Sequence, residues 1–149
     1  QAAEYRFGEL PLGDGRLKVI EQLTDYLLAI NFSGVVRMET HVANYCLTVA
    51  GANGYVPAED LMVAGCDRIG VAPEEAYQMG LGQSVTFANF IRLADERSEK
   101  KIRFEIISLG NSDPLLEYPG NTDDISASVW NRIAAVNNRV VVFIIPDGY

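Results

Sequence analysis

The chain has 149 residues, of which 48% are apolar and 21% charged, and its formal net charge is −8 at pH 7. This length suits one domain with a hydrophobic core, and the composition excludes a disordered tail. The negative charge, without any Lys/Arg cluster in the sequence, argues against nucleic acid as a partner and against docking on anionic lipid.

Membrane and targeting segments are not evident in the sequence. The longest apolar run, Val140 to Pro146, is far shorter than the roughly 20 residues of a membrane-spanning helix. The first residues, Gln1 to Tyr5, show neither the basic nor the apolar region of a secretion signal. We therefore expect either a mature secreted protein or, in preference, the soluble piece of a membrane-anchored one.

The first part of the chain predicts a strand, a helix and a second strand. Tyr5 to Leu12 alternates loosely before a turn at Gly13, which is typical of a short strand. Asp14 is expected to cap a helix, because apolar residues then recur at helical spacing. This stripe consists of Leu17, Ile20, Leu23, Leu27 and Ile30. A strand is expected from Val35 towards His41.

The segment from about residue 44 to residue 75 is harder to assign, and its sequence predicts turns and a short helix. Gly51, Asn53 and Gly54 indicate a turn, and Pro57 followed by acids indicates a helix that ends near Asp67. Pro73 with Glu74 and Glu75 repeats this start signal and predicts a longer helix. One face of that helix is expected to carry Met79, Ser84, Phe87, Ile91 and Ala94.

The last part of the chain predicts a strand from Ile102 to Ser108, a long loop, a helix and a final strand. Asp123 or Asp124 is expected to cap the helix, whose apolar face is Val129, Ile133 and Val136. The six apolar residues from Val140 to Ile145 are typical of a strand buried on both faces. The whole chain, 1–149, is thus predicted to be one α+β domain with helices packed on a mixed four-stranded sheet.

The sequence contains no recognisable catalytic, phosphate-binding or metal-binding motif. His41 is the only histidine, and a structural role for it is favoured over a catalytic one. Cys46 and Cys66 are the only cysteines. They form either a disulfide, which would close a loop of about 20 residues worth roughly 3 kcal/mol, or a pair of buried thiols. Neither cysteine has a second metal ligand at suitable spacing, so we expect no metal site. Because catalytic and phosphate-binding motifs are not recognisable either, we also expect no cofactor and no enzymatic activity.

Four degenerate motifs follow one another along nearly the whole chain. Val36 to His41 is similar to the V-x-V-E-G-H-T-D segment of the OmpA C-terminal domain, and Ala76 to Ile91 keeps the spacing of its N-x-x-L-S-x-x-R-A-x-x-V helix. Leu109 to Pro114 resembles the G-x-G-E-x-x-P loop, and Asn138 to Val140 resembles the closing N-R-R-V strand. The chain therefore resembles the OmpA/MotB-like family of peptidoglycan-associating domains. The closest likeness is to the MotB branch, which includes stator-like accessory subunits such as those of type 1 secretion systems.

The resemblance implies an OmpA-like sandwich in the periplasm, as the soluble part of an inner-membrane-anchored protein. Its implied partners are the stem peptide of peptidoglycan, the subunits of an inner-membrane complex, and a second copy of the chain in a homodimer. The periplasm is an oxidising compartment, so the resemblance also favours the disulfide between Cys46 and Cys66.

In the family, an Asp and an Arg grip the diaminopimelate end of the stem peptide through charge-assisted hydrogen bonds. At the matching positions this chain has Ala43 and Gln83, and it has Ala76 and Gly80 where the family has Asn and Ser. The loss of two such bonds weakens binding by about 100-fold or more. The degenerate site implied by the resemblance comprises Thr40, His41, Ala43, Asn44, Gln83 and Ser84.

Two functions follow from this comparison. In the first, the domain associates with peptidoglycan, either through uncharged hydrogen bonds or through protonated His41. The His41 route predicts tighter binding below about pH 6.5. In the second, the domain has lost the ligand and serves as a protein-interaction domain. Relative to the spacing in the family, the segment of about residues 44–75 is an insertion. It either covers the binding cleft, provides a contact surface, or is a decorative loop held by the disulfide.

Overall fold

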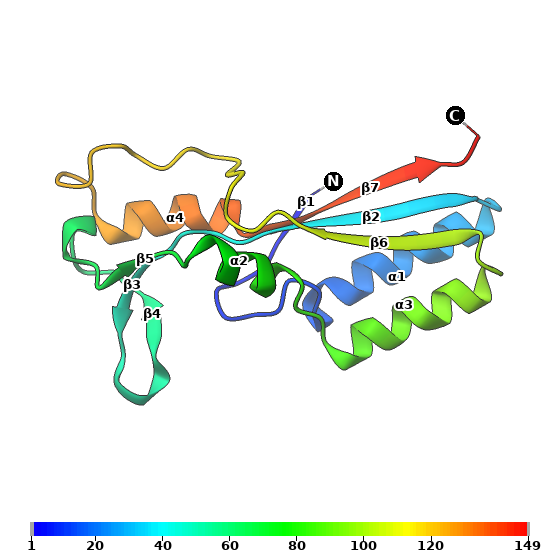
Figure 1. The fold of residues 1–149 in the computed structure, drawn as a ribbon, viewed down its shortest axis with the longest axis horizontal. Helices are drawn as coiled ribbons and strands as arrows, with labels where there is room; N and C mark the ends of the chain where they lie inside the picture. The colour runs from blue at the N-terminus through cyan, green and yellow to red at the C-terminus, as the bar shows by residue number, and fades with distance from the viewer. Residues whose placement is uncertain (1, 149) are drawn as a thin grey trace.

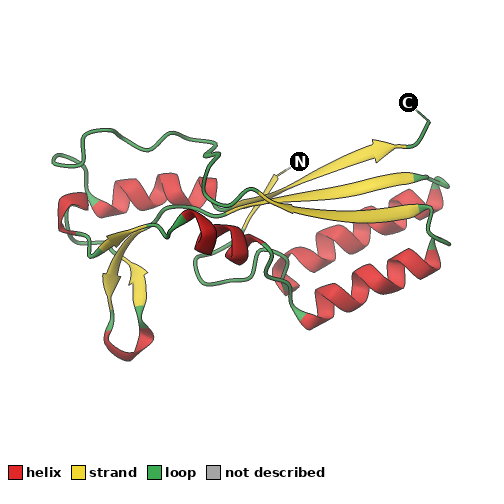
Figure 2. Ribbon diagram, in the orientation of Figure 1, coloured by secondary structure: helices red, strands yellow, loops and turns green. Residues whose placement is uncertain are grey.

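The main sheet of the molecule has four strands in the order β1-β7-β2-β6, and a smaller sheet has the order β4-β3-β5 (Figures 1 and 2). The computed structural model describes residues 2–148, and for Asn53 it describes the backbone alone. The elements are β1 (Ala2–Glu4), α1 (Asp14–Ala29), β2 (Gly34–His41), β3 (Cys46–Val49), η1 (Gly51–Asn53), β4 (Tyr55–Pro57), η2 (Val63–Gly65), β5 (Arg68–Ile69), α2 (Pro73–Gly80), α3 (Val85–Arg97), β6 (Ile102–Ser108), α4 (Ala127–Asn137) and β7 (Arg139–Pro146). The predicted α+β class with a mixed four-stranded sheet is confirmed.

The central strand, β2, organises the main sheet. It pairs in parallel with β6, from Gly34 opposite Ile102 to Thr40 opposite Ser108. It also pairs antiparallel with β7 along its whole length, and among the described residues β1 pairs with Arg139 to Val141 of β7. Helices α1 and α3 lie side by side beneath one face of this sheet (Figure 1).

The main core lies between the sheet and these two helices. Burial alternates along β2, so that Val36, Met38 and Thr40 are buried, as expected for a strand with one covered face. From α1, Ile20 and Leu27 are buried against them, as the apolar stripe predicts, whereas Ile30 follows the end of the helix and is exposed. The largest cluster comprises Tyr5, Leu12, Ile20, Met38, Phe87 and Val140.

At the amino end, the prediction of a strand from Tyr5 to Leu12 is wrong, because the strand is β1 and residues 5–12 form a loop. The buried guanidinium of Arg16 holds this loop by donating hydrogen bonds to the carbonyl oxygens of Pro11 (3.1 Å) and Leu10 (2.9 Å). Asp14 does not cap α1. The N-cap position is Gly13, and the Asp14 carboxylate instead accepts a hydrogen bond from Ser84.

In the insertion, the predicted helix from Pro57 to Asp67 is also wrong. Pro57 ends β4, where it lies opposite Leu47 of β3, and only a single 3-10 turn, η2, follows. The predicted long helix after Pro73 is divided into two helices, α2 and α3. The first ends at Gly80, and the second is capped by Ser84, whose hydroxyl accepts a hydrogen bond from the N–H of Phe87 (3.1 Å).

Towards the carboxyl end, α4 begins at Ala127 and is capped by Ser126 rather than by Asp123 or Asp124. Its buried residues are Ala127, Trp130, Ala134 and Asn137, so the predicted face of Val129, Ile133 and Val136 is wrong. The prediction that the last strand is buried on both faces is wrong for its second half, where Phe143, Ile144 and Ile145 are exposed. Among the described residues, no helix has the length and apolar character needed to cross a membrane.

Candidate functional site

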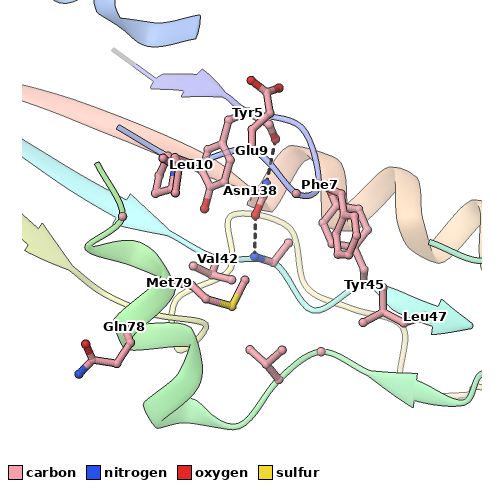
Figure 3. Close-up of a pocket in the computed structure, with 16 residues that line it drawn as sticks. Tyr5, Phe7, Glu9, Leu10, Val42, Tyr45, Leu47, Gln78, Met79 and Asn138 are labelled. Carbon is pink, nitrogen blue, oxygen red and sulfur yellow. Dashed lines mark hydrogen bonds between the residues drawn. The ribbon is translucent and has the colours of Figure 1, made fainter. Parts of the chain in front are cut away.

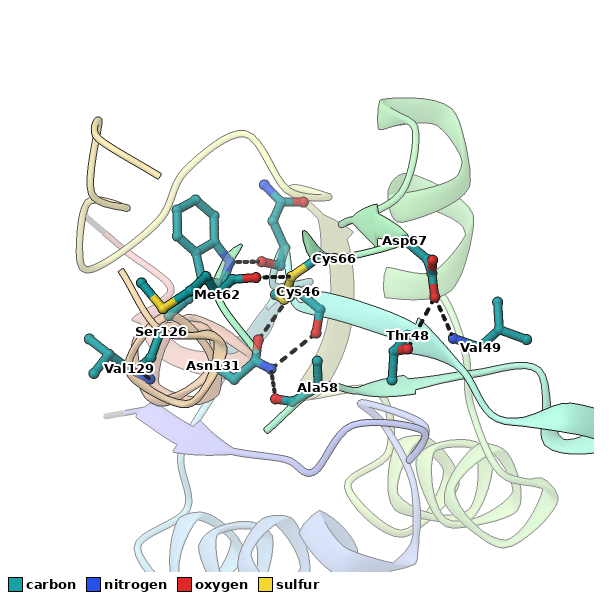
Figure 4. Close-up of a disulfide and its surroundings, with 12 residues drawn as sticks. Cys46, Thr48, Val49, Ala58, Met62, Cys66, Asp67, Ser126, Val129 and Asn131 are labelled. Carbon is teal, nitrogen blue, oxygen red and sulfur yellow. Dashed lines mark hydrogen bonds between the residues drawn. A yellow bond between two sulfur atoms is a disulfide. The ribbon is translucent and has the colours of Figure 1, made fainter. Parts of the chain in front are cut away.

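The inserted segment is fastened to α4 by a disulfide and a set of side-chain hydrogen bonds (Figure 4). Cys46 and Cys66 are bonded, with their Cα atoms 5.6 Å apart, within the range that disulfides require. The Asn131 side chain accepts from the N–H of Cys46 (2.8 Å) and donates to the carbonyl oxygens of Cys46 (3.0 Å) and Ala58 (2.9 Å). The amide of Asn131 thus bonds the backbone of two inserted stretches at once.

Aromatic side chains complete this attachment. The indole of Trp130 donates to the carbonyl oxygen of Asn44 (2.7 Å). Its ring stacks on that of Tyr118 at a centroid distance of 4.8 Å, and the Tyr118 hydroxyl accepts from the N–H of Asn44 (2.8 Å). Cys46, Ala58, Val63, Ala127 and Trp130 form a second buried cluster. The insertion is therefore an integral part of the fold rather than a decorative loop.

A cavity of about 450 Å³ lies between the insertion, the loop after β1 and the end of α2 (Figure 3). Five segments form its walls: the loop after β1, the stretch from the end of β2 into β3, the residues between β5 and α2, the end of α2 with the turn that follows it, and Asn138 just before β7. The lining residues are Tyr5, Phe7, Gly8, Glu9, Leu10, Pro11, Val42, Ala43, Tyr45, Leu47, Gly70, Val71, Gln78, Met79, Gly82 and Asn138. Such a lining suits an apolar ligand group.

The cavity has buried walls and an exposed apolar rim. Tyr5, Ala43 and Leu47 are buried, whereas Leu10 and Met79 are 45 and 44% exposed. The rim therefore offers apolar surface that solvent reaches, leading to an apolar interior. This is the arrangement expected where a partner inserts a side chain.

Two polar side chains at the cavity, those of Asn138 and Tyr5, are already paired within the fold. Asn138 accepts from the N–H of Ala43 (3.0 Å) and donates to the carbonyl oxygen of Tyr5 (2.8 Å). The Tyr5 hydroxyl donates to the carbonyl oxygen of His41 (2.8 Å), and burial raises the pKa of Tyr5. Burial, with smaller effects of Tyr118 and Glu4, raises the pKa of Tyr45 to about 12. Both phenols are therefore uncharged at neutral pH.

Glu9 is the only charged side chain among these described lining residues. Its carboxylate accepts from the N–H of Arg6 (3.0 Å), which lowers the pKa of Glu9, and a contact with Arg16 (3.3 Å) adds to this effect. Because the Glu9 carboxylate already accepts hydrogen bonds from Arg6 and Arg16, it is poorly placed to act as the anionic partner of a ligand ammonium group.

The structure brings one member of the predicted site, Ala43, into this cavity. Thr40 is buried beneath α2 and donates to the carbonyl oxygen of Gly80 (2.7 Å). His41 is buried on the other side of the strand end, among Gly110, Asp113 and Tyr118. The Asn44 side chain accepts from Asn111 (2.9 Å). These three side chains therefore face the protein interior or neighbouring loops instead of a shared ligand site.

Gln83 and Ser84 lie in the turn between α2 and α3. Gln83 is exposed and pairs through its backbone with Leu12, whereas Ser84 caps α3. Gly82, immediately before them, lines the same cavity as Ala43. The two segments that the resemblance assigns to ligand binding therefore meet at one cavity, but the side chains of Gln83 and Ser84 are not part of its lining.

Sequence reasoning missed most of the cavity. The sequence predicts a strand at Tyr5, Phe7 and Leu10, and it places Tyr45 and Leu47 in a segment of turns and a short helix. The available signal was the density of large apolar residues in stretches that lack a helical or strand period. Among residues 2–148, no group of three His, Cys, Asp or Glu side chains is arranged to hold a metal ion.

The environment of His41 opposes its protonation. Burial lowers the pKa of the imidazole, and the nearby Arg139 guanidinium lowers it further, against the smaller opposite effects of Asp113 and Glu39. Protonated His41 can therefore replace a ligand-binding cation only at a pH below the ordinary value of about 6.5.

We expect His41 to make the fold less stable on acidification. The unfolded chain takes up a proton near pH 6.5, about the ordinary pKa of histidine, whereas folded His41 resists protonation until lower pH. In that interval the unfolded state binds more protons, so the free energy of unfolding falls by at most about 1.4 kcal/mol per pH unit from this group. Denaturant titrations between about pH 7.5 and about pH 5 measure the slope. His41→Gln, which keeps every other titrating group, should have the shallower slope, and equal slopes would contradict this account.

No protein-family model matches the chain, and no curated protein matches it. The fold and the cavity together define an α+β domain with a preformed, largely apolar cavity.

Proposed function

We propose that this domain is a non-catalytic binding module of a cell-envelope complex, and that its cavity receives an apolar side chain of a partner protein. The proposal rests on the lining of the cavity, whose side chains are largely apolar. Ala43, one of the lining residues, stands where the family that the chain resembles has its ligand-binding aspartate. Burial of one leucine-sized side chain supplies about 1.5 to 3 kcal/mol, so the cavity contributes part of a larger contact with the partner.

The cellular setting is part of this proposal. The disulfide supports an oxidising compartment, because such bonds rarely persist where thiols are kept reduced. A periplasmic location, as the soluble part of an inner-membrane-anchored protein, rests on the resemblance to OmpA/MotB-like domains. The exposed apolar rim around Leu10 and Met79 supports a role in assembly with other subunits.

Association with peptidoglycan is the competing proposal. It has to rely on uncharged groups, and of the residues carried over from the family, Gln83 is exposed beside the cavity. Thr40 and His41 are buried, so they are poorly placed to bind a wall fragment. The geometry therefore favours the interaction domain over the wall anchor.

Two binding measurements separate these proposals. In the first, the chain is incubated with purified sacculi from about pH 5 to about pH 8, the range over which histidine titrates, and retention is measured. In the second, N-acetyl-leucine amide is titrated while backbone amide NMR signals are followed. We expect no retention on sacculi, and we expect shifts confined to cavity residues such as Ala43, Tyr45 and Gly82.

The variant Met79→Asp tests whether the rim matters, because it places a carboxylate at the cavity entrance. It should abolish the ligand-induced shifts, whereas Val85→Asp, at an exposed position of α3 that does not line the cavity, should leave them unchanged. Retention on sacculi that Gln83→Ala removes, together with an unresponsive cavity, would instead support the wall anchor.

A further inference from the structure

The negative charge of the chain is concentrated on one half of the fold. Residues 42–80 and 109–138 form the insertion, α2, the loop after β6 and α4. They contain nine acidic residues and only two basic ones, Arg68 and Arg132, and so carry −7 of the net charge of −8. In Figure 1 these elements lie together, away from α1 and α3. Such an uneven distribution attracts a partner of positive charge to this half.

Two further hollows adjoin the cavity on this side of the molecule. Tyr45 lines the cavity, a hollow of about 650 Å³ beside the loop after β1, and a hollow of about 520 Å³ between the end of β4 and α4. The cavity and the first hollow also share Phe7, which lies beside Tyr45 in Figure 3. The two hollows share Ala135 of α4. A ligand chain that enters the cavity therefore has room to continue over Tyr45 towards α4.

The hydroxyl of Tyr45 is available to such a ligand. Tyr45 is only 7% exposed, yet its hydroxyl makes no hydrogen bond with another described residue. The oxygen is not among the fully buried unpaired atoms, so it reaches one of the hollows that the ring lines. A phenol hydroxyl both donates and accepts hydrogen bonds. It can therefore bind a peptide group that lies over the ring.

The hollow beside α4, hereafter the α4 hollow, carries two unpaired carboxylates. Glu59 and Asp60 line it, and both are exposed. Neither forms an ion pair or a hydrogen bond within the described part of the chain. Arg132 is the one basic residue in the lining of this hollow, whereas the hollow beside the loop after β1 is lined by two acidic and two basic residues. The excess of negative charge therefore lies at the α4 hollow.

We propose that the partner contributes a basic peptide segment, which inserts one apolar side chain into the cavity and directs lysine or arginine side chains to Glu59 and Asp60. This inference rests on the proposed function and adds the charge of the partner and the path of its chain. Exposed ion pairs each tighten binding by only about 1.5- to 5-fold. The apolar side chain therefore stays necessary, and the charges select the partner.

Three synthetic peptides test this proposal. The first is acetyl-Lys-Lys-Gly-Leu-Gly-Lys-Lys-amide, the second has glutamate in place of every lysine, and the third has alanine in place of leucine. Each is titrated into the 149-residue chain while backbone amide NMR signals are followed. The lysine peptide should shift Ala43 and Gly82 at the cavity, and Ala58 and Ser128 at the α4 hollow.

The peptides should differ in affinity in a way that depends on salt. We expect the lysine peptide to bind about tenfold or more tightly than the glutamate peptide, since each of several exposed charges contributes a small factor. The difference should shrink between about 20 mM and about 300 mM salt, because ions screen exposed charges. The alanine peptide should bind more weakly than the lysine peptide and leave the cavity signals in place.

Two double variants separate the α4 hollow from the overall charge. Glu59→Gln with Asp60→Asn should weaken binding of the lysine peptide by about 2- to 25-fold, the product of two exposed ion pairs. It should not change the response to N-acetyl-leucine amide. Glu21→Gln with Glu99→Gln removes the same charge from exposed positions outside the acidic half, and it should leave the affinity nearly unchanged.

The outcomes distinguish this inference from the function on which it rests. If N-acetyl-leucine amide shifts the cavity signals but the lysine and glutamate peptides bind equally, the basic partner is wrong and the proposed function stands. Equal losses of affinity in the two double variants likewise overturn the assignment to Glu59 and Asp60. A cavity that responds to none of the four probes overturns both proposals.

Discussion

Replacing both Cys46 and Cys66 by alanine is expected to lower the free energy of unfolding by about 3 kcal/mol. The bond joins residues 20 positions apart and so limits the unfolded chain within that loop. In the folded state it ties β3 to η2, two parts of the insertion that otherwise rely on short strands and single hydrogen bonds. Urea titration of wild type and of the double variant measures the difference.

The location of the damage is as informative as its size. Tyr45 and Leu47 flank Cys46 in the sequence and line the cavity. Loss of the disulfide should therefore loosen the cavity wall before it affects the main sheet. Hydrogen exchange should therefore quicken in β3 and β4, while β2 and β6 keep their protection. Wild type treated with a reductant should behave like the double variant. Uniformly faster exchange across both sheets would contradict a local role for the disulfide.

The substitution Gly80→Ala is expected to destabilise the protein by about 1 to 3 kcal/mol, the usual range for overpacking. In an exposed helix the same change stabilises by up to about 1 kcal/mol, so the sign is the test. A Cβ at Gly80 would collide with the Ser108 Oγ and lie 2.7 Å from the Thr40 Oγ1. Neither hydroxyl is free to move, since Ser108 donates to the carbonyl oxygen of Tyr77 (2.8 Å) and Thr40 to that of Gly80 (2.7 Å).

A matched glycine in α1 serves as the control for Gly80→Ala. A Cβ at Gly15 would meet only a carboxylate oxygen of the partly exposed Glu9, 3.3 Å away, so Gly15→Ala should be much less destabilising than Gly80→Ala. Adding Ser108→Ala to Gly80→Ala should recover part of the lost stability, because it removes the closest collision. Thermal or urea denaturation of the four proteins gives the comparison. If Gly80→Ala and Gly15→Ala change the stability equally, close packing of α2 on the sheet is not the reason for glycine at position 80.

The same contact bears on one position at which this chain differs from the family that it resembles. The resemblance aligns Gly80 with a serine, yet any side chain here would meet Thr40 and Ser108. The approach of α2 to β2 and β6 thus depends on a residue without a Cβ. It also places Met79 at the rim of the cavity rather than in the core, where the helical period had predicted it.

Elements with a strong internal period were predictable from the sequence. The apolar stripe of α1 and the strand at β2 follow from alternation and helical spacing, and the run from Ile102 to Ser108 matches β6. The pairing of Cys46 with Cys66 was one of two readings and is confirmed. The cavity was not predictable, because its lining comes from five separated segments that carry no shared pattern.

By itself the sequence determined the α+β class, the central strands and the absence of a charged pair at positions 43 and 83, because these depend on local period and residue type. Only the tertiary structure decided the rest. Pro57 lies in a strand because Leu47 is opposite it, and Arg68 and Ile69 form a strand because Leu47 and Cys46 are opposite them. Long-range pairing overrides local propensity at such places, since a backbone hydrogen bond requires a partner that is distant in the chain.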